Sequence, residues 1–162
     1  LRDKDTPSRT VYSLCAAMLG RICLSGDVLN MPPEKVSLIR EGLDFYRSVK
    51  DIVRDGDIVR IDCDVTYYRA PYGRQIYEKQ LGNRKLVVVH ALQKPDAVEV
   101  PIAGYRLVRA YTDIAYTAED GVLRLAAAQE PPAGTPFPGG VLPGEHGELV
   151  FRAGAFLLEK ET

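Results

Sequence analysis

The stretch GRICLSGDVLNMPPEKVSLIREGLDFYRSVKDIVRDGD, from Gly20 to Asp57, joins a short apolar run to a long amphipathic segment. The apolar run, residues 22–24, lies between Gly20 and Gly26 and contains no polar residue. Such a run is typical of a strand that is buried on both faces, as the strands of parallel sheets are. A strand of this kind needs neighbouring strands, so we expect its partners to lie outside this chain.

Both flanks of this run are predicted to be helices. Before it, apolar residues recur every three or four positions, which predicts a helix capped by Ser8 or Thr10 and ending at Gly20. After it, Pro32 and Pro33 suit the first turn of a second helix that ends at residues 55–56, because a first turn leaves N–H groups unpaired anyway. One apolar stripe runs along this second helix: Val36, Ile39, Leu43, Tyr46, Val49 and Val53.

From residue 57 onward the pattern is that of short strands. Apolar and polar residues alternate, and turn residues separate the runs, as at 81–85 and 118–121. Without helices between them, such strands predict an antiparallel β-sandwich. Residues 130–148 hold five Pro and five Gly and are predicted to be a loop. The predicted strands are 57–67, 74–80, 85–92, 97–102, 105–112, 121–127 and 149–159.

Composition excludes several classes of partner. With 21 basic and 22 acidic residues and no basic cluster, the chain has no electrostatic basis for binding nucleic acid. No apolar stretch reaches the roughly 20 residues that cross a membrane. The first ten residues lack the layout of a signal peptide, which favours a cytoplasmic location. Because Leu1 is not an initiator Met, we expect the chain to be part of a longer protein. The three cysteines, Cys15, Cys23 and Cys63, are predicted to be buried free thiols.

No complete catalytic constellation is visible. The chain lacks GxSxG, HExxH, GxxxxGK[ST] and GxGxxG, and we predict no metal or cofactor. His90 is predicted to be a sheet residue, and His146 lies in the proline-rich loop. Asp62 and Asp64 lie about 7 Å apart on one face of a strand. Metal binding or carboxylate catalysis is one interpretation of this pair, but a solvated polar face is the favoured one because no third ligand is evident.

Two segments are candidates for binding sugar. Tyr67, Tyr68 and Tyr72 offer flat apolar rings with polar tips, which suit sugar stacking; packing of an edge strand is the simpler interpretation. The other segment is Ser25-Gly26-Asp27, at the carboxyl end of the first predicted strand, where α/β sheets and barrels bind their ligands. Gly26 permits close approach and Asp27 can accept hydrogen bonds from hydroxyl groups, although a helix-capping or loop-bracing role for Asp27 is equally open.

The segment AAMLGRICLSGDVLNMPPEKVSLIREGLDFYRSVKDIVRDGD resembles the end of the catalytic domain of α-galactosidases and α-N-acetylgalactosaminidases of glycoside hydrolase families 27 and 36. The resemblance rests on a small-residue helix leading through LGR to a last barrel strand, on Phe45-Tyr46, and on the closing residues 52–56. It covers residues 15–56 closely, whereas the remainder is similar only in architecture.

This resemblance implies that residues 1–55 are the last helix–strand–helix of a (β/α)8 barrel and that residues 56–162 are a C-terminal antiparallel β-sandwich. It implies a retaining hydrolase whose two catalytic carboxylates lie upstream, so this chain alone is expected to be inactive and to meet carbohydrate through the rest of the barrel. Without the rest of the barrel, this part would expose apolar surface, which a homo-oligomer can cover. Two alternatives are a non-catalytic carbohydrate-binding or interaction module and a small enzyme that uses Asp62 and Asp64.

Overall fold

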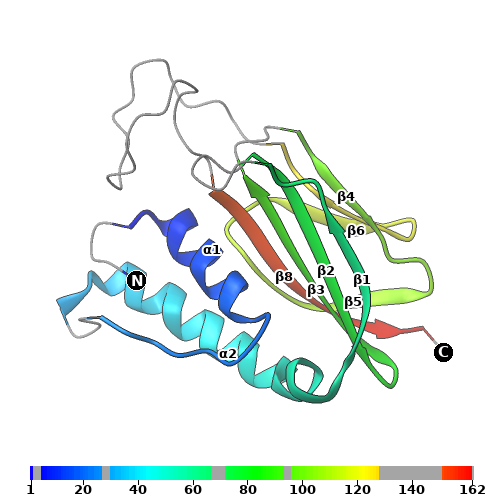
Figure 1. The fold of residues 1–162 in the computed structure, drawn as a ribbon, viewed down its shortest axis with the longest axis horizontal. Coiled ribbons are helices and arrows are strands. Elements are labelled where there is room, and N and C mark those ends of the chain that lie inside the picture. Colours follow the sequence, from blue (N-terminus) through cyan, green and yellow to red (C-terminus); the bar gives the residue numbers. More distant parts are fainter. Residues whose placement is uncertain (2–4, 27–29, 67–71, 93–95, 128–150, 162) are drawn as a thin grey trace.

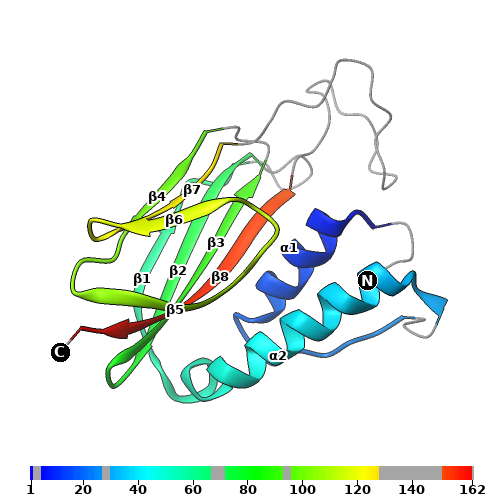
Figure 2. The same ribbon diagram turned by 180° about the vertical axis from the view of Figure 1, so that it is seen from behind.

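The computed structural model describes residues 1, 5–26, 30–66, 72–92, 96–127 and 151–161. In this part of the chain, two helices precede eight strands that form two antiparallel sheets. Figures 1 and 2 show the helices as a layer on one face of the larger sheet, with the smaller sheet against its other face. The chain is therefore mainly β, and the two sheets fit the predicted β-sandwich.

Helix α1 spans Pro7–Ala17 and has Thr6 as its N-cap. The side-chain hydroxyl of Thr6 accepts a hydrogen bond from the Arg9 N–H at 3.1 Å, and so pairs one of the amides that a first turn leaves free. The predicted caps, Ser8 and Thr10, are wrong, because both lie inside the helix and the Thr10 hydroxyl donates back to the Thr6 carbonyl. Pro7 suits the first turn, so the helix begins earlier in the chain than predicted.

Helix α2 spans Pro33–Asp55 without interruption, as its prolines and its Asp55-Gly56 end predict. The predicted apolar stripe is only partly right. Ile39, Val49 and Val53 are buried, but Val36, Leu43 and Tyr46 are only partly covered at the flank of the core. The buried face of α2 is rotated relative to the predicted stripe. It includes Gly42, Phe45 and Ile52 in addition to the three buried stripe residues.

Gly42 is where α2 comes closest to its neighbours. A Cβ at this position would lie 2.8 Å from Cζ of Tyr111 and 2.9 Å from Cδ1 of Leu14. Both side chains are buried, and the Tyr111 hydroxyl donates to the Leu38 carbonyl at 3.0 Å. Glycine therefore costs helix propensity here but lets α2 pack closely on α1 and the sheet.

The larger sheet has the strand order β1-β2-β3-β8-β5, and the smaller has the order β4-β7-β6. Each of the seven predicted runs contains one strand, so these predictions are confirmed. Strand β6 was missed because its end overlaps the predicted turn at 118–121; the turn itself is formed by Asp120 and Gly121, both with positive φ. The strands are β1 (Asp57–Cys63), β2 (Gly73–Leu81), β3 (Arg84–Leu92), β4 (Val98–Pro101), β5 (Tyr105–Thr112), β6 (Tyr116–Glu119), β7 (Val122–Leu125) and β8 (Phe151–Lys160).

The central strands bury both of their faces. In β3, Leu86 and Val88 join the core beneath the helices, while Val87 and Val89 join the core between the sheets. Strand β8 divides its residues in the same way. A continuous apolar run therefore marks the middle layer of a three-layer antiparallel structure here, rather than a parallel strand.

The predicted buried strand at residues 22–24 is wrong. Residues 21–26 form neither helix nor strand, and Cys23 and Leu24 are exposed. Every strand pair among the described residues is antiparallel, so the end of a barrel is not shown. The run is too short to stay buried without neighbouring strands, and in this structure it follows the outside of the helical layer (Figure 1).

We predict that Gly42→Ala lowers the free energy of unfolding by about 1 to 3 kcal/mol, because the added methyl group must displace buried Tyr111 and Leu14. Urea denaturation measures this change. Gly20→Ala is the control, since a Cβ there meets nothing within 4 Å, and it is expected to stay within about 0.5 kcal/mol. A Gly42→Ala protein as stable as the parent would contradict the close packing of α2.

Candidate functional site

Ser25 and Gly26, two of the three predicted substrate-facing residues, are exposed on the segment between α1 and α2. Gly26 has a φ of 114°, and a Cβ there would lie 2.8 Å from the carbonyl oxygen of Leu1. Glycine is therefore required where this segment passes the first residue of the chain. The third residue, Asp27, lies outside the described residues.

Tyr72 is the only one of the three predicted sugar-stacking tyrosines that lies in the described part of the chain; Tyr67 and Tyr68 lie outside it. Its side chain is 46% exposed. Tyr72 and Thr66 exchange backbone hydrogen bonds of 2.8 and 3.1 Å, which extend the pairing of β1 and β2. Tyr72 lies at the β1–β2 end of the larger sheet, whereas Ser25 lies between α1 and α2, so these described members of the two predicted sites belong to different layers.

The carboxylates of Asp62 and Asp64 are both held by Arg74. Its guanidinium lies 4.0 Å from Asp62, which also pairs with Arg60 at 3.1 Å, and its backbone N–H donates to Asp64. Within the described residues, no group of His, Cys, Asp and Glu side chains is arranged to hold a metal ion. The favoured prediction for this pair, a polar face, agrees with these contacts.

Next to Asp62, Glu78 is buried within an ion-pair network on the same face of the sheet. Its carboxylate lies 3.2 Å from the Arg60 guanidinium and 3.1 Å from the Lys85 ammonium group, which also lies 4.4 Å from the centre of the Tyr105 ring. A buried carboxylate needs such partners, because its desolvation is otherwise costly. The network therefore has a structural explanation.

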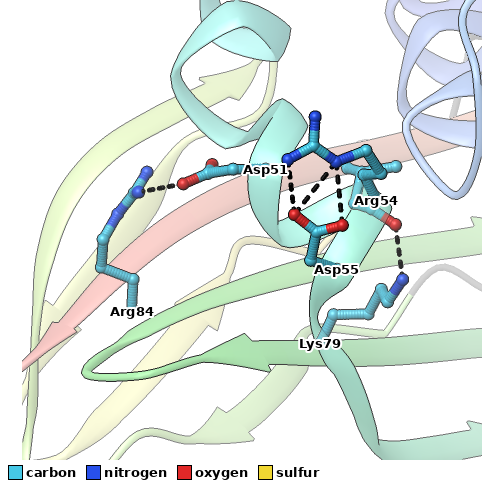
Figure 3. Close-up of polar contacts among 6 residues, drawn as sticks. Asp51, Arg54, Asp55, Lys79 and Arg84 are labelled. Atoms are coloured by element: carbon cyan, nitrogen blue, oxygen red, sulfur yellow. Dashed lines mark hydrogen bonds and ion pairs between the residues drawn. The ribbon is translucent and has the colours of Figure 1, made fainter.

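A second group of polar contacts joins the end of α2 to the β2–β3 hairpin (Figure 3). The Lys79 ammonium group donates to the Val53 carbonyl at 2.5 Å, where the helix has unpaired carbonyls, and Arg84 pairs with Asp51 at 2.7 Å. Arg54 pairs with Asp55 beside them. These contacts fix the helical layer relative to the sheet.

His90 lies on the face of β3 that the helices cover, which confirms it as a sheet residue. It is only 2% exposed, and neither ring nitrogen has a hydrogen-bond partner among the described residues. The Tyr12 ring packs edge-on against the His90 ring, with 4.9 Å between the ring centres. The centre of the Phe151 ring lies 5.0 Å from that of Tyr12. Burial lowers the pKa of His90 to about 4, so the ring is neutral at pH 7 and out of reach of a substrate.

Of the three predicted buried thiols, only Cys15 is buried. Its sulfur lies 3.9 Å from the Tyr111 carbonyl, and burial raises its pKa, which makes the thiol unreactive. Cys23 and Cys63 are exposed, so the prediction of burial is wrong for them, and all three are free. Among the described residues, neither helix combines the length and apolar character needed to cross a membrane.

Strand β1 carries an exposed apolar strip that the sequence pattern did not predict. Ile58, Val59 and Ile61 are 55%, 49% and 60% exposed. Strand β1 lies at one edge of the larger sheet, and the main helix contacts fall on β2, β3, β5 and β8. The consecutive pair Ile58-Val59 breaks the expected alternation at a bulge, and it was the only local signal of this surface.

No protein-family model matches the chain, and no curated protein matches it in sequence. Among solved structures, the chain is similar in fold to Amy13B of Eubacterium rectale, with a TM-score of 0.52 and 8% sequence identity. The match covers 96% of this chain and 35% of that chain, so this chain spans about a third of its length. At this identity the likeness shows the fold alone.

We predict that protonation of His90 destabilises the protein in acid. The pKa of His90 is lowered from 6.5 to about 4 on folding, so between these values the unfolded chain binds the proton and the folded chain does not. Stability is therefore full above pH 6.5 and falls by roughly 3 kcal/mol as the pH drops to about 4.

The measurement is the free energy of unfolding at a series of pH values for the parent chain and for His90→Leu, which cannot titrate at this position. We expect the difference in unfolding free energy between the two proteins to change between pH 6.5 and about 4 and to be constant above pH 6.5. Parallel curves across the whole range would contradict the assignment to His90.

Proposed function

We propose that this chain is the C-terminal part of a retaining glycoside hydrolase acting on terminal α-linked sugars. Residues 1–55 would complete the catalytic barrel, and residues 56–162 would form a sandwich that braces it. The observation that carries the proposal is the extent of the structural match. It takes in the helical layer as well as the sandwich and lies within the much longer chain of Amy13B. The activity proposed here comes from the resemblance of residues 15–56 to glycoside hydrolases.

The two sides of the helical layer support a bracing role. One side is buried against the larger sheet and is fixed there by the contacts of Gly42 and by the polar junction at the end of α2. The flank of α2 keeps Val36, Leu43 and Tyr46 only partly buried. Side chains of this kind suit a helix that packs on a sandwich on one side and on the remainder of a barrel on the other.

The catalytic carboxylates are proposed to lie elsewhere in the parent protein. A retaining hydrolase needs two carboxylates about 5 to 5.5 Å apart, one as nucleophile and one as acid and base. In this chain Asp62 is paired with two arginines and Glu78 with an arginine and a lysine. These groups already serve as ion-pair partners, so we propose neither of them as a catalytic carboxylate.

Ser25, Gly26 and Asp27 are the proposed substrate-facing residues. The exposure of Ser25 and Gly26 in the present structure leaves them accessible to a sugar. A serine hydroxyl and an aspartate carboxylate suit the hydroxyl groups of a sugar, because the serine can donate and accept hydrogen bonds and the carboxylate can accept them. The assignment itself rests on the sequence resemblance.

We expect the isolated chain to hydrolyse 4-nitrophenyl α-galactoside and 4-nitrophenyl α-N-acetylgalactosaminide no faster than buffer does, because it lacks both catalytic carboxylates. Release of nitrophenol is measured across a range of substrate concentrations, and Asp62→Asn is the matched variant. Saturable turnover by the parent chain that this variant loses would overturn the proposal and favour a small enzyme.

A non-catalytic carbohydrate-binding module is the second candidate, and the exposed ring of Tyr72 favours it. NMR titration of the chain with galactose and with oligosaccharides separates the two functions. A binding module would show saturable shifts at Tyr72 that Tyr72→Ala abolishes and that the control Tyr116→Ala, which changes another exposed tyrosine, preserves. The bracing role predicts no saturable shift in any of these proteins.

A further inference from the structure

Strand β1 leaves one edge of the larger sheet without a neighbouring strand among the described residues. Edge strands expose unpaired backbone N–H and C=O groups, and proteins usually protect them with charges or cover them. Here the edge also carries the exposed apolar side chains of Ile58, Val59 and Ile61. Such an edge is suited to pairing with another strand.

The backbone hydrogen bonds show which residues of β1 face outward. Just after β1, Asp64 donates its N–H to the Arg74 carbonyl of β2 at 3.1 Å, and Thr66 donates to the Tyr72 carbonyl, next to β2, at 2.8 Å. In an antiparallel ladder, alternate residues direct their backbone groups to the same neighbour. Arg60 and Asp62 therefore continue the pairing with β2, whereas Ile61 and Cys63 direct their N–H and C=O groups away from the sheet.

We propose that two copies of this chain pair through β1, antiparallel about a two-fold axis, with Ile61 of one copy opposite Ile61 of the other. In this register the outward backbone groups of the two Ile61 residues bond to each other. Arg60 of each copy then lies opposite Asp62 of the other, at positions where side chains come closest. Both side chains have room to interact, since Arg60 is 33% and Asp62 is 36% exposed.

Neighbouring registers are less favourable. Pairing centred on Arg60 or on Asp62 would place like charges opposite each other and would direct inward-facing backbone groups at the partner. Pairing centred on Cys63 keeps the correct backbone groups but sets Asp62 opposite Asp64. Only the register centred on Ile61 combines paired backbone groups, opposite charges and an apolar centre. The interface is isologous, so it closes as a dimer.

The first experiment measures the mass of the chain in solution by light scattering, at chain concentrations from about 5 to about 500 µM. The range extends this high because a single strand pair is a small interface and is expected to bind weakly. We expect the weight-average mass to rise from 17.9 kDa toward twice that value. Ile61→Lys should weaken the association by about tenfold or more. Val108→Lys is the matched control: Val108 is also exposed, at 43%, but lies on β5 at the opposite edge.

A mass of 17.9 kDa throughout, or equal effects of the two lysine variants, would overturn the proposal. Circular dichroism checks that both variants are folded, which is expected because both positions are exposed.

The second experiment tests the register by disulfide cross-linking in a Cys23→Ser, Cys63→Ser background. Ile61→Cys places two thiols on residues whose Cα atoms are about 5.5 Å apart, within the range of a disulfide. Mild oxidation should cross-link this variant and leave the control Val108→Cys monomeric. The comparison is a chain that keeps Cys63 and has Cys23→Ser alone. In it the two Cys63 residues are about 14 Å apart. Cross-linking through Cys63 as fast as through Ile61→Cys would indicate another register and overturn the proposal.

Discussion

Burial of both faces of β3 and β8 is the constraint on which the rest of the structure depends. Their alternate side chains enter two separate cores, one beneath the helices and one between the sheets. A strand that is apolar on both faces is stable only as the middle of three layers, because either exposed face would leave several large side chains in water. The two helices and the smaller sheet are therefore both required.

The same constraint decides how polar groups behave in the interior. Arg152 lies on β8, and its guanidinium donates to the carbonyls of Ala126 and Asp96 at 2.5 and 2.7 Å. Glu78 is paired with two cations, and His90 is held neutral by burial. Arg152 and Glu78 keep their charges because they have partners of this kind. His90 has no hydrogen-bond partner for its ring among the described residues, and it is neutral at pH 7.

The helical layer and the edge strand suit different partners. The layer presents a partly buried apolar flank on α2, which fits the proposed contact with a barrel. The edge presents backbone groups, two charges and isoleucine, which fit a second copy of the same strand. The two surfaces belong to different layers, so one protein can use both. The similarity to Amy13B concerns the fold alone, while the resemblance to families 27 and 36 rests on sequence motifs.

The sequence by itself determined the local elements. Periodicity, prolines and glycines located α2 and seven of the eight described strands, because these signals act within a few residues of the chain. Only the tertiary structure decided which of these surfaces are covered. Cys23, Leu24 and Ile61 are apolar yet exposed, and Gly42 is explained by Tyr111 and Leu14, which are distant in sequence. Burial depends on what packs against a residue, and a local pattern does not contain that information.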